Sequence, residues 1–235
     1  MTSIRQWLMK CPLQVELPIR LVCKWPDRFL SQLKYYGEWY DSFSAKGMFQ
    51  EQPWLPFECI EWLDHYLDME MKVFEWGTGG STVFFAKRVE QVWSIEHDSD
   101  WYNRVNNELN NRGMNNVELM LEPPEDSKES TVEYGSEKKP YRDASFRSYV
   151  KSIDRSDESL FDLVLVDGRC RMGCLKEAKS HVASGGCIVL DDAQRSRYQQ
   201  ARSIMETWSV ERVFDGLKPA TRGRAQTVLY RKSSS

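Results

Sequence analysis

Short apolar runs alternate with helix-like segments from Lys72 onward, and this alternation limits the fold more than any other feature of the sequence. Alternating strands and helices are typical of a parallel sheet with helices on both faces. Continuous apolar runs such as "FDLVLV" indicate strands that are buried on both sides. The strand-like runs are 72–76, 91–96, 116–121, 161–168, 187–192, 210–217 and 225–231. The sequence therefore predicts an α/β fold with a doubly wound, mostly parallel sheet of seven strands.

The last two strand-like runs have no helix between them, and a turn with Pro, Arg and Gly joins them. This arrangement predicts a closing hairpin, in which the last strand is antiparallel. The helix-like segments are 81–89, 99–113, 145–153, 175–184 and 198–208. We expect Ser81 to be the N-cap of the first, and Gly185 and Gly186 to end the fourth.

Residues 1–70 have a different pattern, which is aromatic, helix-like and interrupted by prolines. We interpret them as a helical cap packed on a main domain of residues 71–235. Their rings favour a core between cap and sheet, and a role of some rings in lining a pocket stays open: Trp25, Tyr35, Tyr36, Trp39, Tyr40, Trp54 and Trp62. The polar stretch 122–141 is long for a loop in a compact domain, and such loops are usually functional or mobile.

Charge and composition exclude several classes of partner. The chain has 32 basic and 35 acidic residues and a net charge of -3, which gives no electrostatic footprint for nucleic acid. No run approaches the roughly 18 apolar residues of a membrane span, and the N-terminal region lacks the pattern of an export signal. We therefore expect a cytoplasmic protein with no membrane partner. An oligomer is compatible with the aromatic N-terminal region.

A glycine turn follows the first strand-like run and contains Gly77, Gly79 and Gly80. The dinucleotide fingerprint needs a third glycine at position 82, where this chain has Thr82. Glu75 precedes the turn, where an acid repels a pyrophosphate and favours a cation. Glu96 ends the next run, where a carboxylate can accept ribose hydroxyls. The two acids together suit S-adenosylmethionine, which is a nucleoside with an ammonium and a sulfonium group.

The pattern "VFEWGTGGST…SIEHD…FDLVLVDG…GGCIVLDD" resembles the class I S-adenosylmethionine-dependent methyltransferases over about residues 53–231. The segments "PWLPFECIEWL", "VDGRCRMGCLKEA" and "GLKPATRGRAQTVLYR" also resemble a bacterial group of largely uncharacterised O-methyltransferases. The resemblance implies that Glu75 lies near the ammonium group of the cofactor and Glu96 near its ribose, with His97 and Asp98 beside the adenine. It implies a cofactor-binding set of Glu75, Gly77, Thr78, Gly79, Gly80, Ser81, Glu96, His97 and Asp167.

Three aspartates at the ends of the later strand-like runs are the candidates for chemistry. Asp167 lies near the end of the run 161–168, and Asp191 and Asp192 end the run 187–192. Asp167 and Asp192 are the candidate catalytic residues, and Asp167 would act as a general base or orient an acceptor hydroxyl. Alternatively, Asp167, Asp191 and Asp192 surround Mg²⁺ or another divalent cation, which lowers the pKa of that hydroxyl. A third reading makes Asp191 a loop cap.

The acceptor is the least defined part of the prediction. The leading hypothesis is O-methylation of a small-molecule or carbohydrate hydroxyl; the alternatives are a non-catalytic S-adenosylmethionine-binding module and a methyltransferase that acts on protein or nucleic acid. Arg169, Arg171 and Arg195 either pair with the aspartates or bind an anionic acceptor. Cys170 and Cys174 are expected to pack as small hydrophobic residues.

Overall fold

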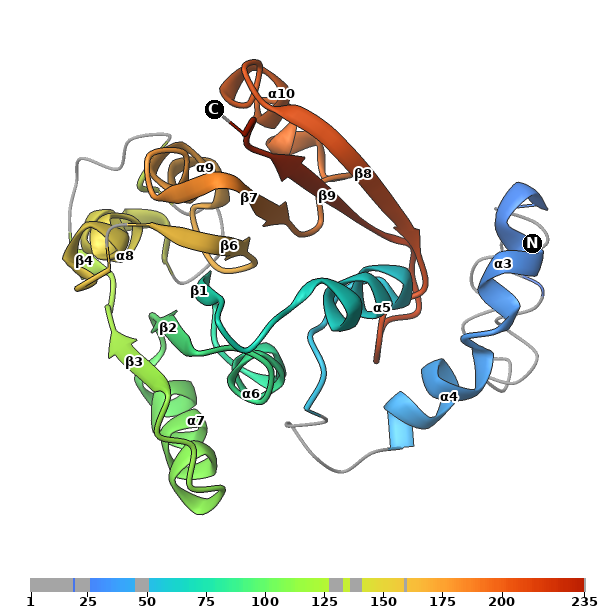
Figure 1. The fold of residues 1–235 in the computed structure, drawn as a ribbon, viewed down its shortest axis with the longest axis horizontal. Helices are drawn as coiled ribbons and strands as arrows, with labels where there is room; N and C mark the ends of the chain where they lie inside the picture. The colour runs from blue at the N-terminus through green and yellow to red at the C-terminus, as the bar shows by residue number, and fades with distance from the viewer. Residues whose placement is uncertain are drawn as a thin grey trace.

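The computed structural model describes residues 19, 26–44, 51–126, 133–135, 141–158 and 160–234. A seven-stranded sheet has the order β3-β2-β1-β6-β7-β9-β8 (Figure 1). Strand β9 is antiparallel to both of its neighbours, and the other strands are parallel to one another. The predicted fold class and the antiparallel last strand are confirmed. The strands are β1 Lys72–Trp76, β2 Gln91–Glu96, β3 Val117–Leu121, β6 Phe161–Val166, β7 Val182–Leu190, β8 Ser209–Gly216 and β9 Ala225–Arg231.

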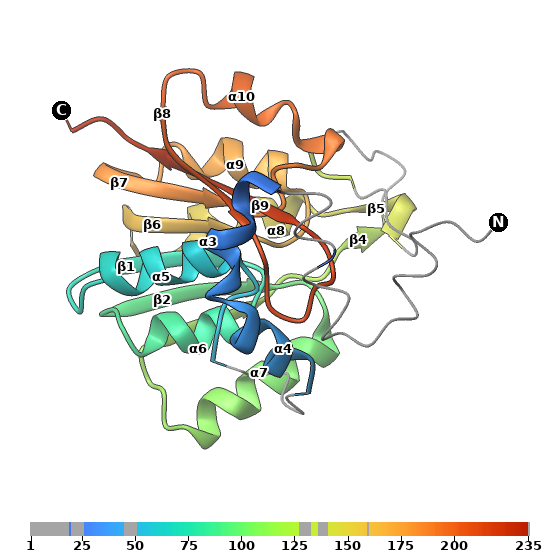
Figure 2. The same cartoon turned by 90° about the vertical axis from the view of Figure 1, so that its right-hand side faces the viewer.

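Helices cover both faces of this sheet, which explains the continuous apolar runs. Side chains alternate along a strand, so Leu163 and Leu165 face one layer while Val164 and Val166 face the other. Figure 2 shows α5 (Phe57–Tyr66) and α6 (Gly80–Ala86) in front of the sheet and α9 (Arg171–Ala178) behind it. Helix α7 (Ser99–Asn111) packs on α6 through a small apolar cluster. The second layer also contains α8 (Arg147–Val150) and α10 (Ala201–Ile204).

The parallel strands end level with one another, which determines where a site can form. Trp76 at the end of β1 pairs with Ile95 of β2 and with Val166 of β6. Val166 in turn pairs with Leu190 at the end of β7. The residues that follow these four strands therefore lie along one edge of the sheet. The strand order reverses between β1 and β6, and crevices at such reversals are the usual ligand sites of open α/β sheets.

The N-terminal region contains α3 (Phe29–Leu33), α4 (Tyr36–Ser44) and the short helix η1 (Pro26–Arg28). Tyr35 and Trp39 belong to the same buried cluster as Phe57 of α5 and Val73 of β1. The tyrosine ring stacks on Phe57 with 5.3 Å between the ring centroids. These contacts join the region to one face of the sheet. The boundary at residue 70 stays a prediction.

Local differences from the sequence prediction have simple physical reasons. Ser81 lies inside α6 and not at its N-cap, because the hydroxyl of Thr82 accepts the backbone N–H of Gly79 at 2.9 Å. Gly185 and Gly186 lie within β7, and α9 ends earlier, at Ala178. The stretch 122–141 contains the short strand β4 (Glu125–Asp126), which pairs with β5 (Ala144–Ser145). Residues 127–132 and 136–140 of that stretch, and Trp25, lie outside the described residues.

None of the helices within the described ranges is both long and apolar enough to span a bilayer.

Candidate functional site

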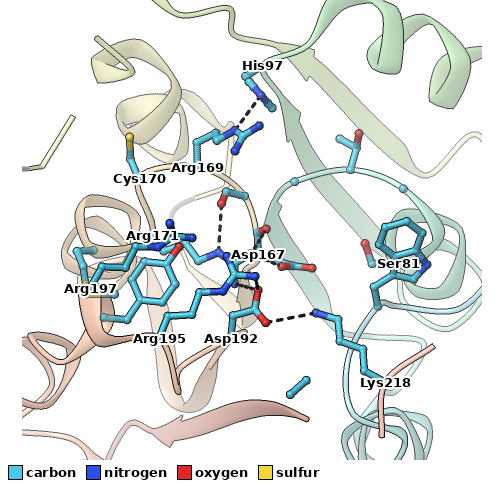
Figure 3. Close-up of a pocket in the computed structure, with 18 of the residues that line it drawn as sticks. Ser81, His97, Asp167, Arg169, Cys170, Arg171, Asp192, Arg195, Arg197 and Lys218 are labelled. Carbon is cyan, nitrogen blue, oxygen red and sulfur yellow. Dashed lines mark hydrogen bonds and ion pairs between the residues drawn. The ribbon is translucent and has the colours of Figure 1, made fainter. Parts of the chain in front are cut away.

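A cavity of about 1270 Å³ opens at the carboxyl edge of the sheet. It collects residues that follow β1, β2, β6 and β7, which is the arrangement that the sequence predicted for the site. Figure 3 shows Ser81, His97, Asp167 and Asp192 around this space. Of the predicted site residues, Glu75 and Asp191 do not line the cavity but are buried behind its wall. Those that line it are Gly77, Thr78, Gly79, Gly80, Ser81, Glu96, His97, Asp98, Asp167 and Asp192.

The glycine turn needs glycine at two positions for separate reasons. Gly77 has φ +100°, and a Cβ there would lie 3.1 Å from the Cα of Gly168. A Cβ on Gly80 would lie 2.4 Å from the carbonyl oxygen of Gln52. The turn is therefore enclosed by the β6 turn and by the segment before α5. Side chains are absent where the backbone faces the cavity, so a ligand can approach the N–H groups closely.

Glu75 lies beneath the glycine turn and is fully buried. Its Oε1 accepts hydrogen bonds from Thr82 Oγ1 at 2.5 Å and Ser94 Oγ at 2.6 Å, and its Oε2 has no partner among the residues that the structure describes. Burial raises the pKa of Glu75 to about 7, although the bonds from Ser94 and Thr82 oppose this shift. Thr82, where this chain departs from the dinucleotide pattern, thus links the turn to the strand. The structure gives Glu75 no face on the cavity.

Glu96 is 4% exposed at the end of β2, and both of its carboxylate oxygens accept hydrogen bonds. Oε1 accepts the backbone N–H groups of His97 at 2.7 Å and Asp98 at 2.9 Å. Oε2 accepts the hydroxyl of Thr78 at 3.0 Å. Burial opposes ionisation, but the bonds from His97 and Asp98 outweigh it and lower the pKa of Glu96. A carboxylate is therefore held in place on the cavity wall.

His97 is oriented from both ring nitrogens. Its Nδ1 lies 2.6 Å from Glu96 Oε1, and its Nε2 accepts the Nε–H of Arg169 at 3.1 Å. Because a guanidinium only donates, this geometry corresponds to a ring with its proton on Nδ1. The Arg169 guanidinium also lies 5.4 Å from the ring centroid of Tyr141. His97 and Arg169 form one connected wall of the cavity.

Asp98 serves the helix that follows and not the cavity alone. It is the N-cap of α7, and its carboxylate accepts the backbone N–H of Trp101 at 2.9 Å. The Trp101 indole N–H donates to the carbonyl of Thr78 at 2.9 Å. Trp101 also lines the cavity, so it connects the glycine turn to the β2 end.

The three aspartates do come together, but cations lie between them. Arg171 Nη2 donates to Asp167 Oδ1 at 2.7 Å, and its Nη1 lies 3.3 Å from Asp191 Oδ2 and 3.5 Å from Asp192 Oδ2. Lys218 Nζ lies 2.7 Å from Asp191 Oδ2. Arg195 forms an ion pair with Asp192. Figure 3 shows Arg171 and Lys218 directed at this cluster.

This pairing sets the charge states of the cluster. Burial alone would raise the pKa of Asp191, but the cations of Lys218 and Arg171 outweigh it and lower that pKa. Burial and the neighbouring Asp191 carboxylate raise the pKa of Asp167. Of the two, Asp167 is the one that retains contact with the cavity, since its side chain is 23% exposed. It is therefore the better proton acceptor of the pair.

The acidic cluster does not fit a divalent cation. Each aspartate already has a guanidinium or ammonium group on an oxygen that a metal would need. No group of three His, Cys, Asp or Glu side chains suited to a metal occurs in the part of the chain that the structure describes. The residues of this cluster favour an ion-pair network over the Mg²⁺ reading, and no metal-assisted step is derived from them.

Several residues of the site were missing from the sequence prediction. Lys218 comes from the β8–β9 turn, far along the chain from Asp191. Gly168 follows Asp167 directly, and a Cβ there would lie 1.9 Å from the hydroxyl oxygen of Tyr149. For Lys218 the available signal was a basic hairpin turn, which also contains Arg222 and Arg224; for Gly168 it was the "DG" pair after a buried strand. Neither signal gives the partner.

The other singled-out residues separate into packing and surface roles. Cys174 is fully buried and Cys170 half-buried; burial raises the pKa of the Cys170 thiol to about 12, which is consistent with packing. Among the rings of the N-terminal region, Trp39 is buried in the core, whereas Trp54 is 52% exposed and lines the cavity. Arg171 and Arg195 pair with carboxylates, and Arg169 bonds to His97.

No family profile matches the chain, and no curated protein matches it in sequence. Solved structures share its fold. A Streptococcus mutans protein described as a methyltransferase, whose structure contains S-adenosylhomocysteine, is 12% identical to this chain. The two superpose with a TM-score of 0.52 over 75% of this chain and 97% of that one. A methyltransferase-like protein of Silicibacter pomeroyi is 24% identical, with a TM-score of 0.51 over 79% of this chain and 92% of that one. An rRNA methylase of Streptococcus thermophilus is 13% identical, with a TM-score of 0.50 over 74% of this chain and 93% of that one. The chain therefore has the class I methyltransferase fold.

Proposed function

We propose that this protein is an S-adenosylmethionine-dependent methyltransferase that acts on a hydroxyl group of a small molecule or a carbohydrate. The observation that carries the proposal is that the glycine turn, Glu96 and Asp167 line one cavity at the reversal point of the sheet. A cofactor site and a candidate base thus face the same space. The O-methyl acceptor also follows the resemblance to the O-methyltransferase group.

The residues present fit S-adenosylmethionine. The backbone of Gly77 and Gly79 lines the cavity where its methionine part would lie, and the missing Cβ of Gly77 lets the turn pack against Gly168. Glu96 is ionised and held rigidly on the cavity wall, where it would accept hydrogen bonds from the hydroxyls of a ribose. His97 and Trp101 offer flat faces beside that carboxylate for an adenine ring. Glu75 supports the turn from below through its hydrogen bond with Thr82, which in turn accepts the N–H of Gly79.

Asp167 is the group we assign to the acceptor hydroxyl. When bound, the cofactor supplies a sulfonium methyl group, which an acceptor oxygen attacks in line as the carbon–sulfur bond breaks. Asp167 accepts the proton that this oxygen loses, and its raised pKa makes it a stronger base than an exposed aspartate. Arg171 donates to Asp167 Oδ1 and fixes its orientation. Asp192, the second catalytic candidate, lines the same cavity but is held by two arginines.

The test is methyl transfer itself, measured as S-adenosylhomocysteine released with a panel of hydroxylated small molecules and saccharides. We expect Asp167→Asn to lower turnover by about a hundredfold while S-adenosylmethionine still binds. Asp192→Asn is expected to lower turnover less, because the Asp192 carboxylate is already paired with Arg171 and Arg195 and is a poorer proton acceptor. Undiminished turnover of the Asp167 variant would remove this residue from the chemistry, and lack of cofactor binding would overturn the proposal as a whole.

A further inference from the structure

Several cationic side chains around the cavity pair with carboxylates, and Arg169 donates to His97, but Arg197 has neither kind of partner among the described residues. Arg171, Arg195 and Lys218 pair with the aspartates, and Arg224 pairs with Asp215. Arg197 lines the same cavity and is exposed, yet no carboxylate among the described residues lies within ion-pair distance of it. Figure 3 shows its side chain beside Arg171 and Arg195. An unmatched guanidinium at a pocket wall is a ready receptor for an anion.

The position of Arg197 is fixed by the ring that follows it in the chain. Its guanidinium carbon lies 4.9 Å from the ring centroid of Tyr198. That ring is 8% exposed, and Arg171 contacts it as well, at 5.6 Å. Tyr198 ends the short helix η4 (Ser196–Tyr198) and donates its backbone N–H to the carbonyl of Arg195 at 2.8 Å. Because Arg197 already stacks on a buried ring, it loses less conformational entropy when it binds a ligand.

We infer that Arg197 binds a carboxylate or phosphate group of the acceptor, so that the acceptor is a hydroxy acid. This inference rests on the proposed function, because it places the acceptor hydroxyl at Asp167. Arg171 bonds to Asp167 and also contacts the ring of Tyr198, and Arg197 contacts the same ring. The Arg171 that orients Asp167 and the Arg197 assigned to the anion therefore contact the same tyrosine ring, on one wall of the cavity.

The observations favour a small acid over a nucleic acid. A protein that binds nucleic acid neutralises several phosphates at once, and its affinity comes from many unpaired cations. Here the cations around Arg197 already have carboxylate partners, and Asp98, Asp100 and Asp192 line the same cavity. The net charge of -3 also disfavours binding of a polyanion such as nucleic acid. A single fixed guanidinium is suited to one anionic group.

The test measures binding of matched probes to the full chain, with and without S-adenosylhomocysteine, by calorimetry. One set is glucuronate, glucose 6-phosphate and glucose; the other is 4-hydroxybenzoate, 4-hydroxyphenyl phosphate and 4-hydroxybenzamide. We expect the charged members of at least one set to bind and its neutral member to bind about tenfold to a hundredfold more weakly. Comparison of the carboxylate and phosphate members of each set shows which of the two anionic groups Arg197 binds. Arg197→Ala is expected to remove the preference for charged probes.

Two variants separate anion recognition from a structural role. Arg197→Lys keeps the charge but not the planar fork, so it should retain only part of the preference. Arg202→Ala, which removes an exposed arginine of α10 that does not line the cavity, should leave the preference unchanged. Equal binding of neutral and charged probes, no binding of any charged probe, or equal losses in the Arg197 and Arg202 variants would each overturn the inference. So would tighter binding of a short RNA that Arg197→Ala abolishes, since the acceptor would then be nucleic acid.

The readout also separates this inference from the proposed function. Binding of S-adenosylhomocysteine and binding of the acid probes are measured independently, and neither needs turnover. Cofactor binding without any charge preference would contradict only the role of Arg197. A charge preference without cofactor binding would contradict the methyltransferase proposal and leave an anion site of another kind.

Discussion

Glu75 is the residue whose environment differs most from that of an ordinary side chain. It is fully buried, and Oε2 has no hydrogen-bond partner among the described residues. Its pKa is raised from 4.5 to about 7 by burial. The folded state therefore binds a proton more tightly than the unfolded state does. This contribution to stability is complete below about pH 4.5 and is lost as the pH rises through about 7.

The Glu75→Gln variant should make this dependence visible. Gln resembles the protonated carboxyl group, so the variant should gain stability relative to the wild type as the pH rises from about 5 to 8, by roughly 3 kcal/mol at most. The measurement is the free energy of unfolding by urea at several pH values. Glu70→Gln, which changes an exposed carboxylate, is the matched control. Parallel curves for wild type and Glu75→Gln would show that the buried carboxyl group does not titrate in this window.

At the scale of single residues, the sequence predicts side chains that lie directly after strands. Glu96 and Asp167 follow buried runs, so the topology of a parallel sheet brings them to one edge whatever the loops do. Lys218 lies in the β8–β9 turn, and its partner Asp191 belongs to a segment distant in the chain. Arg197 contacts the adjacent Tyr198, but its place on the cavity wall depends on the fold. The same limit applies to the acidic cluster. Its spacing was visible in the sequence, and pairing of Arg171 and Arg195 with it was one of two readings, but the contribution of Lys218 was not predicted.

At the scale of elements, the turns after β1 and β6 pack backbone against backbone. A Cβ on Gly168 would lie 1.9 Å from Tyr149 Oη and 3.0 Å from the carbonyl group of Trp76. Gly168→Ala should therefore destabilise the protein by about 1–3 kcal/mol. Tyr149→Phe in the same chain removes the closest atom and should restore part of that loss, as measured by thermal unfolding. Identical stabilities of the single and double variants would mean that Tyr149 is not the obstacle.

The β8–β9 turn is connected to the N-terminal helices, and it carries Lys218. The indole N–H of Trp39 donates to the carbonyl of Thr221 at 2.8 Å, and Ser42 Oγ accepts the N–H of Ala220 at 2.8 Å. Helix α4 thus supports the turn that carries a residue of the acidic cluster.

Removing the first of these bonds should loosen the turn. Trp39→Phe keeps most of the packing but loses a hydrogen bond of about 1 kcal/mol. We expect faster amide hydrogen exchange across residues 217–224 and lower turnover, with cofactor affinity unchanged. Trp62→Phe is the control, since that ring stacks on Tyr66. Unchanged exchange in the Trp39 variant would show that the turn does not depend on this contact.

Elements were predicted well where apolar periodicity is strong and poorly where local chemistry decides. The run 72–76 coincides with β1, and 91–96 with β2. By contrast, the predicted helix 198–208 contains only the short α10 and the last residue of η4. Gly185 and Gly186 were read as a helix stop, yet they continue strand β7 at an irregularity between its Val182 and Cys187 pairs with β6, where Gly185 has φ +76°.

At the scale of the whole molecule, the order of the strands connects sequence to function. The reversal between β1 and β6 brings a glycine turn, a ribose-type acid and a candidate base to one cavity. The alternation of strands and helices was sufficient to predict this sheet. The acceptor was not predictable, because the walls that would select it come from η4, the hairpin turn and Trp54, which share no pattern in the sequence.

A calorimetric titration with S-adenosylmethionine tests whether the cavity binds this cofactor. We expect saturable binding of one equivalent and no comparable binding of NAD. In Glu96→Ala the affinity should fall by about tenfold or more, because a buried charged partner of the ribose is removed. Circular dichroism checks that the variant is folded. Absence of binding to the wild type would contradict the proposed cofactor site, and equal affinity in a folded Glu96→Ala variant would contradict the role of Glu96 in it.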